Sequence, residues 1–326
     1  MISKSIFNIS ILLLSCITLQ AQSSRPVPVI FDTDMGPDYD DVGAITLLHA
    51  FEDKGEATIL ATVASTKYEG VAAVLNVLNT YFKKPDLPIG VPRGKALELK
   101  DVQHWTDTLI AKYPHKINSN KEVADAVSLY RSVLSKQPDN SVTIITVGFL
   151  TNISNLLQSK ADEYSSLTGK ELVRKKVSKL VSMAGKFPSG HEFNVREDAF
   201  ASQYALNNFP KPVIFSGFEI GAKIKSGMPL IHNTAIRNSP VKDVFKICIP
   251  LDEQDKEGRM SWDQTAVLVA IRGHEPFYKL KEGKIVVDEK GNNKWDDNGR
   301  GQFHLVEDQS PSQVSGIIND LMMHHP

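Results

Sequence analysis

Cysteine is scarce in this 326-residue chain, which contains only Cys16 and Cys248. Two cysteines cannot build the disulfide framework of a small secreted domain, and a chain of this length can bury a full core without one. Excess positive charge is also absent, because the 37 Lys and Arg residues are balanced by 38 Asp and Glu residues. The chain therefore lacks the basic balance that drives binding to a phosphate backbone, and a nucleic-acid polymer is not an expected partner.

The longest apolar segment lies at the N-terminus, before any expected strand or helix. Lys4 carries one positive charge, residues 6–19 are mostly apolar, and Ala21 offers a small residue for cleavage. This order is typical of a secretory signal peptide. We therefore expect residues 1–21 to be a signal peptide, residues 22–326 to form the mature domain, and the protein to be exported to the periplasm.

Two other uses of this N-terminal segment stay open. A membrane anchor needs about 20 predominantly apolar residues followed by a charged flank, and we do not expect a transmembrane span. Residues 13–16 (Leu-Leu-Ser-Cys) resemble a lipobox, so lipid anchoring at Cys16 is an alternative to cleavage after Ala21. Cleavage after Ala21 leaves Cys248 as a lone thiol, which we expect to be a small buried hydrophobe.

Strand-like and helix-like segments alternate along the mature chain. The expected strands are short apolar runs at 27–31, 57–64, 87–91, 142–147, 179–184 and 212–215. The expected helices, with apolar residues at helical spacing, are 41–50, 70–82, 102–113, 121–135, 152–158 and 197–208. This alternation predicts a parallel sheet with helices on both faces, and continuous apolar strands fit burial on both sides.

The C-terminal third has a different pattern. After Pro240 the sequence becomes more helical, with helices expected at 262–271 and 313–323 and a β-hairpin between them, formed by 284–288 and 294–295. We find no internal repeat and no Gly/Ser-rich linker that would divide the chain. We therefore predict one α/β domain with a mostly parallel, Rossmann-like central sheet flanked by helices.

Acidic residues concentrate where the first expected strand ends. Five aspartates fall within ten residues: Asp32, Asp34, Asp38, Asp40 and Asp41. Carboxylates this close repel one another unless a cation or a helix N-terminus absorbs the charge, and Ca²⁺ and Mg²⁺ prefer oxygen ligands. The loop predicts a divalent-cation site, and a solvated acidic loop that caps the next helix is the plainer alternative.

Three further polar segments share this edge of the predicted sheet, where ligands bind in open α/β folds. Residues 148–152 leave one strand and enter a helix, and residues 189–194 lie between another strand and a helix. Residues 261–264 open a helix, where Asp263 is either a site residue or a simple N-cap. Together with the aspartate loop, these segments predict a single site.

On these residues the chain resembles the inosine–uridine-preferring nucleoside hydrolase family. The carriers are the aspartate loop 32–41, the 148–152 turn, the Glu-Phe-Asn triplet 192–194 and the Trp-Asp pair 262–263. Their order extends the resemblance over essentially all of the mature chain. The family implies an N-glycosidase that cleaves small-molecule nucleosides into ribose and free base, with Ca²⁺ at the bottom of the pocket; a homo-oligomer is left open.

Matching positions imply individual roles. The implied Ca²⁺ ligands are Asp34, Asp41, the Thr151 carbonyl and Asp263. Asp40 resembles the general base that activates a water. The implied substrate-binding residues are Asp38, Glu192, Asn194 and His191, of which Glu192 and Asn194 resemble the residues that hold the ribose hydroxyls.

Trp262 stands where many family members place a proton-donating His. An indole can stack on a leaving base but cannot protonate it. Trp262 therefore resembles the purine-preferring branch of the family, in which stacking assists departure of the base; ordinary core packing is the alternative.

The chain also departs from the family pattern. Its aspartate loop is two residues longer than the commonest form, so Asp38 is an alternative to Asp40 as the base. Residues 65–67 (Ser-Thr-Lys) replace a Gly-Asn pair after the second strand. These changes leave the nucleobase open, and the candidates for recognising it are His191, Lys186, His104, Trp105 and Arg259.

Two functions from other classes remain open. A Mg²⁺-dependent phosphatase of the haloacid dehalogenase type would use Asp32 as its nucleophile, but it leaves the Asp40-Asp41 pair and residues 192–194 unexplained. A non-catalytic or altered-substrate ribose- or sugar-binding protein would use the same scaffold without the reaction.

Overall fold

The computed structural model describes residues 25–326. The expected signal peptide and the lipobox at Cys16 lie outside these residues. Along the described part of the chain, no helix is long and apolar enough to cross a membrane.

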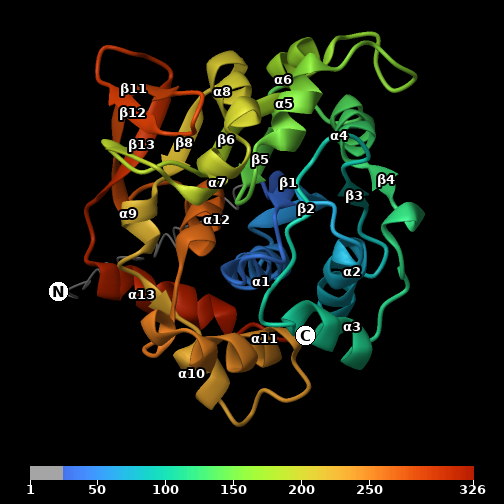
Figure 1. Ribbon diagram of the computed structural model, residues 1–326, viewed down its shortest axis with the longest axis vertical. Helices are drawn as coiled ribbons and strands as arrows, with labels where there is room; N and C mark the ends of the chain where they lie inside the picture. The colour runs from blue at the N-terminus through green and yellow to red at the C-terminus, as the bar shows by residue number, and fades with distance from the viewer. Residues whose placement is uncertain (1–24) are drawn as a thin grey trace, which may run out of the picture.

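An eleven-stranded sheet runs through the molecule in the order β4-β3-β2-β1-β5-β6-β8-β13-β11-β12-β7 (Figure 1). Its strands are β1 (Val27–Thr33), β2 (Ala57–Ala64), β3 (Ile89–Val91), β4 (Ala124–Asp125), β5 (Val142–Thr146), β6 (Val177–Met183), β7 (Ser189–Gly190), β8 (Val213–Ser216), β11 (Tyr278–Val287), β12 (Asn293–Asp296) and β13 (Gln302–Glu307). The pairings from β4 to β13 are parallel, whereas β11, β12 and β7 are added in antiparallel pairings. The predicted mostly parallel α/β fold is confirmed.

Helices cover both faces of the sheet and pack in two hydrophobic layers. One layer contains residues of α1 (Asp40–Asp53), α2 (Val71–Tyr81), α3 (Trp105–Lys112), α11 (Pro240–Cys248), α12 (Trp262–Arg272) and α13 (Pro311–Met322). The other contains residues of α4 (Ala126–Ser135), α5 (Thr151–Gln158), α6 (Gly169–Lys176) and α8 (Ala199–Asn208). The central strands are buried on both faces, as continuous apolar strands between two helical layers require.

Smaller elements complete the fold. They are α7 (Phe193–Glu197), α9 (Phe218–Gly221), α10 (Met228–His232), the two-stranded sheet of β9 (Lys225–Ser226) and β10 (Arg259–Met260), and three 3₁₀ turns at Asn120–Glu122, Ile249–Leu251 and Glu253–Asp255. Cys248 is fully buried in α11, which confirms its prediction as a core residue.

The structure differs from the sequence prediction at several elements. The helix expected over 121–135 begins only at Ala126, because the Asp125 carboxylate accepts a hydrogen bond from the Ser128 amide and caps it there. The helix expected from Val102 begins at Trp105, after His104 in the left-handed region. Strand β13 was not predicted, because its apolar residues form only a short run between polar ends.

The order of strands reverses at β1. From β1 the chain builds outward through β2, β3 and β4, then returns to add β5 on the other side. Such a reversal opens a crevice at the carboxyl ends of the two central strands, which is where ligands bind in open α/β sheets. The loop after β1 and the turn after β5 therefore face each other.

Candidate functional site

The aspartate loop connects β1 to α1 at this crevice. Asp34 follows the end of β1, and Asp40 and Asp41 form the first turn of α1, where the helix dipole favours negative charge. The turn after β5 touches the loop directly, since a Cβ added to Gly148 would lie 2.4 Å from the Asp34 backbone nitrogen. Only glycine allows this approach, which explains Gly148.

Asp32 is separate from the rest of the loop. Its carboxylate is buried in the core and accepts hydrogen bonds from the Tyr130 hydroxyl at 2.7 Å and from the Asn152 amide at 3.1 Å. Burial raises the pKa of Asp32 to about 7, and these two hydrogen bonds oppose that rise. Asp32 does not line the cavity described next, so it is not placed as the nucleophile of a phosphatase.

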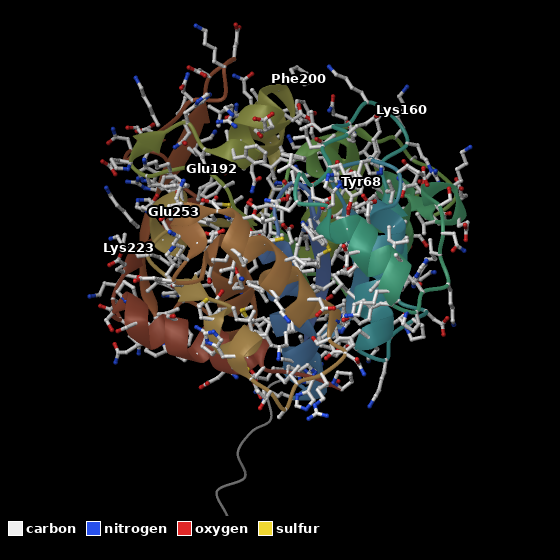
Figure 2. All side chains as sticks on the ribbon, turned by 60° about the horizontal axis from the view of Figure 1, so that its bottom comes forward. Tyr68, Lys160, Glu192, Phe200, Lys223 and Glu253 are labelled. Atoms are coloured by element: carbon white, nitrogen blue, oxygen red, sulfur yellow. The ribbon has the colours of Figure 1, made fainter. Side chains whose placement is uncertain are left out.

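A cavity of about 200 Å³ opens at the crevice. Its lining residues are Asp34, Asp38, Val147, Met183, Glu192, Phe193, Asn194, Phe218, Asp252, Gln254, Arg259, Met260, Trp262 and Asp263. In Figure 2, Glu192 and Glu253 lie near each other although they are distant in sequence, and the two neighbours of Glu253 line the same cavity as Glu192. Three of the four predicted segments thus line the cavity, and Val147 directly precedes the fourth, residues 148–152.

Not every predicted residue lines the cavity. Asp40 and Asp41 are buried and do not line it, and the Asp40 carboxylate accepts the backbone N–H of the lining residue Asp263 at 3.2 Å. Thr151 is buried at the start of α5, and its hydroxyl donates to Asp198 at 2.5 Å. His191 is exposed and its Nε2 lies 3.1 Å from the Lys290 carbonyl, so the structure does not bring it into the site.

Arg259 divides the carboxylates of the site into two groups. Its guanidinium contacts Asp38, lies 3.1 Å from Asp40 and lies 3.4 Å from Asp255. Desolvation raises the pKa of Asp38, but the charge of Arg259 and the hydrogen bonds to Asp40, to the Tyr39 amide and to Arg259 together outweigh it, and the net effect is a pKa below the usual value. Burial and repulsion from Asp38 hold the pKa of Asp40 well above its usual range despite Arg259.

The second group, Asp34, Asp41 and Asp263, has no such counter-ion. One carboxylate oxygen of Asp34 and one of Asp41 are buried without a hydrogen-bond partner. Burial, followed by repulsion from neighbouring aspartates, raises the pKa of Asp41 to about 7 and that of Asp34 and Asp263 well above the usual range. Such buried charge is costly unless something positive lies beside it.

A divalent cation fits this second group. The unpartnered oxygens are the hard donors that Ca²⁺ and Mg²⁺ bind. Within residues 25–326, no three His, Cys, Asp or Glu side chains are already gathered as a closed ligand set, so binding would need these carboxylates to draw together.

Asp263 is not the N-cap of its helix. Helix α12 is preceded by Ser261 at the N-cap position, with no side-chain capping hydrogen bond. The simple-cap alternative for Asp263 is therefore wrong. Asp263 is buried and lines the cavity.

Glu192 and Asn194 are held rigidly at the start of α7. The Glu192 carboxylate accepts backbone N–H groups of Asn194 at 2.8 Å and of Gly185 at 2.9 Å. The Asn194 amide nitrogen donates to the carbonyls of Val147 and Met183 at 3.0 and 3.1 Å. These bonds leave the Asn194 amide oxygen as the end that can meet a ligand.

Trp262 opens α12 and is not an ordinary core residue, because it is half-buried and lines the cavity. Its indole N–H donates to the Phe218 carbonyl at 2.9 Å, and the two ring centroids lie 5.2 Å apart. With its only donor used, Trp262 presents an aromatic surface to the cavity and no proton.

The sequence profile of inosine–uridine-preferring nucleoside hydrolases matches residues 29–315. The chain belongs to this nucleoside hydrolase family. A comparison with curated protein sequences finds no match.

Solved nucleoside hydrolases share the fold at low sequence identity. A plant nucleoside hydrolase is 15% identical with a TM-score of 0.70, and the match covers 91% of this chain and 99% of that one. The purine-preferring ribonucleoside hydrolase of Gardnerella vaginalis is 17% identical, with a TM-score of 0.70 and the same coverage. The inosine–uridine-preferring enzyme of Bacillus anthracis is 15% identical, with a TM-score of 0.68 and coverage of 91% and 99%.

Sequence reasoning missed part of this nucleoside hydrolase site. Asp252, Gln254 and Phe218 line the cavity, and Asp255 is buried behind it. Arg259 was considered only for base recognition, whereas the structure pairs it with Asp38 and Asp40 of the aspartate loop. Asp255 ends a 3₁₀ turn and Asp252 is the N-cap residue of that turn, which is too short to show a hydrophobic period, so no sequence signal placed them.

Proposed function

We propose that this nucleoside hydrolase cleaves the N-glycosidic bond of ribonucleosides, with purine nucleosides preferred, and releases ribose and free base. The observation that carries the proposal is the pair of buried, unpartnered carboxylate oxygens of Asp34 and Asp41 beside a cavity lined by Glu192 and Asn194. One end of this cavity offers acceptors for hydroxyl groups, and Trp262 and Phe218 offer aromatic surface for a base.

Ca²⁺ is the proposed cofactor, and its ligands would be Asp34, Asp41, Asp263 and the Thr151 carbonyl. When bound, the ion would anchor the ribose hydroxyls and polarise the attacking water. The three aspartates of this set are not paired with Arg259, which supports the assignment.

Asp40 is the proposed general base. It takes a proton from the water whose oxygen attacks the anomeric carbon; the bond from that carbon to the base nitrogen breaks, and its electron pair leaves with the base. In the net reaction, one proton of the water ends on the released nucleobase and the hydroxyl group ends on the ribose. One carboxylate oxygen of Asp40 accepts two bonds from Arg259, at 3.1 and 3.3 Å, and the other accepts the Asp263 amide. Because each carboxylate oxygen has two lone pairs, the oxygen bonded to the Asp263 amide keeps one for a water.

The remaining carboxylates would stabilise the oxocarbenium character that develops on the ribose. Stacking of a purine on Trp262 would assist its departure, since the indole N–H is already bonded to Phe218. Export through the expected signal peptide would place this activity in the periplasm, where it would serve purine salvage. The fully buried Cys248 fits an exported domain without an intramolecular disulfide.

A ribose-release assay on residues 22–326 with a panel of purine and pyrimidine nucleosides, with and without chelator, tests the proposal. We expect chelator-sensitive ribose release that is fastest with a purine nucleoside. Hydrolysis of p-nitrophenyl phosphate without nucleoside turnover would overturn it.

A non-catalytic ribose- or sugar-binding protein is the second candidate. It is favoured by the engagement of both Asp40 oxygens, by Arg259 and by the Asp263 amide. Tight ribose binding without turnover in the same assay would select this function.

A further inference from the structure

Arg259 contacts both residues to which the reaction assigns a chemical task. Its guanidinium lies 3.1 Å from a carboxylate oxygen of Asp40, and its central carbon lies 5.0 Å from the Trp262 ring centroid. Its side chain is only 11% exposed, so these contacts are largely desolvated. Both ion pairs and cation–π contacts are stronger when removed from water.

Arg259 is itself held from behind. Its central carbon lies 4.7 Å from the Tyr39 ring centroid, and one of its nitrogens lies 3.4 Å from the buried Asp255 carboxylate. The Tyr39 hydroxyl donates to the same Asp255 oxygen at 2.5 Å. The guanidinium is thus packed against the rings of Tyr39 and Trp262, and its nitrogens are held by the carboxylates of Asp38, Asp40 and Asp255.

The aspartate loop supplies part of this arrangement. Asp38, which also contacts Arg259, lies in this loop two residues before Asp40. Tyr39 separates the two aspartates and packs on the guanidinium. The loop and Arg259 therefore pack together, although the two lie far apart in the chain.

We propose that Arg259 is a positioning residue that orients the Asp40 carboxylate and the Trp262 indole together. Although Arg259 lines the cavity, the role proposed for it is exerted through these two side chains, and the proposal rests on the function proposed above. Arg259 gives Asp40 a fixed partner on one oxygen, while the Asp263 amide fixes the other oxygen. Displacement of a catalytic group by about 1 Å costs about 100-fold in rate.

Three variants test the proposal by steady-state kinetics with a purine nucleoside. Arg259→Met removes the fork and the charge, and we expect kcat to fall about 100-fold while KM changes less than about fivefold. Arg259→Lys keeps the charge without the fork, and we expect it to recover about a tenth of wild-type kcat. Arg272→Met is the matched control, because Arg272 packs on Phe51 at 4.9 Å and pairs with Glu56 away from the site.

The Arg272→Met control should keep kcat within about twofold of wild type. A kcat of Arg259→Met within about threefold of wild type would overturn the proposal. A rise in KM with unchanged kcat would also overturn it, because Arg259 would then bind substrate.

A second readout does not depend on turnover. Acrylamide quenching of Trp262, taken as the difference from the same protein carrying Trp262→Phe, reports how well the indole is shielded; the other tryptophans are Trp105 and Trp295. We expect Arg259→Met to raise the quenching constant about twofold and Arg272→Met to leave it unchanged. If the wild-type protein shows no turnover, the proposed function is wrong, but the quenching measurement still tests whether Arg259 positions Trp262. Equal quenching constants for Arg259→Met and wild type would contradict that role of Arg259.

Discussion

At Asp40, two carboxylate oxygens are held by different parts of the chain, one by Arg259 from β10 and one by the amide of Asp263 from α12. We expect Asp40→Asn to lower kcat at least about 1000-fold, because an amide cannot take the proton of a water, while calcium affinity stays within a few-fold. Ribose release and calcium titration measure the two effects. Asp38→Asn is the control, and the base role moves to Asp38 if only that variant loses turnover.

Asp263 has a different proposed role in the same site. Because it is buried, unpaired with Arg259 and close to other aspartates, we expect Asp263→Ala to weaken calcium binding by at least about tenfold. Asp252→Ala, at the cavity wall, should leave calcium binding unchanged. A titration in which both variants bind calcium like wild type contradicts the role of Asp263 as a ligand.

Trp262 tests the substrate class. If its indole stacks on the leaving base, Trp262→Ala should lower kcat/KM for purine nucleosides about tenfold more than for pyrimidine nucleosides, because the larger ring loses more stacking. Trp262→Phe should recover most of the loss. Equal losses for both classes indicate a packing role and contradict the purine preference.

Among the elements, the turn between β5 and α5 has no room for a side chain at Gly148. A Cβ at Gly148 would lie 2.4 Å from the Asp34 backbone nitrogen, so we expect Gly148→Ala to lower the free energy of unfolding by about 1–3 kcal/mol. In Gly316→Ala, at an exposed position of helix α13, the Cβ has no heavy atom within 4 Å, and we expect a gain of about 0.5–1 kcal/mol. Urea unfolding measures both, and a loss of equal size in the two variants contradicts the close approach at Gly148.

Strands and helices with strong hydrophobic periods were predictable from sequence, and those without were not. Strand β2 matches its predicted range 57–64, and β1 and α12 begin at their predicted first residues. The start of α4 was misplaced because the cap at Asp125 is a local hydrogen bond within a helix-like pattern. The pairing of β13 with β8 was not predictable, because it joins residues almost 90 positions apart and depends on the finished sheet.

In the whole molecule the total charge is near neutral, but negative charge is concentrated in one buried site. The ligand roles in this site were predicted from the family resemblance. The contacts of Arg259 with the site could be seen only in the folded structure. The pKa of Asp41 is raised by burial to about 7. In metal-free protein this group stabilises the fold below its unfolded pKa of about 4 and loses that contribution as the pH rises through 7. We therefore expect chelator to lower the melting temperature more at pH 8 than at pH 5, measured by calorimetry; an equal shift at both pH values contradicts the buried charge.

The central claim is that the carboxylates left free by Arg259 hold a divalent cation which meets the ribose. Its most direct test is a crystal structure of the mature protein with Ca²⁺ and ribose. We predict one ion with oxygens of Asp34, Asp41, Asp263 and the Thr151 carbonyl at about 2.3–2.6 Å, together with two ribose hydroxyls. An ion bound elsewhere, or ribose bound in this cavity with no ion beside Asp34 and Asp41, would contradict it.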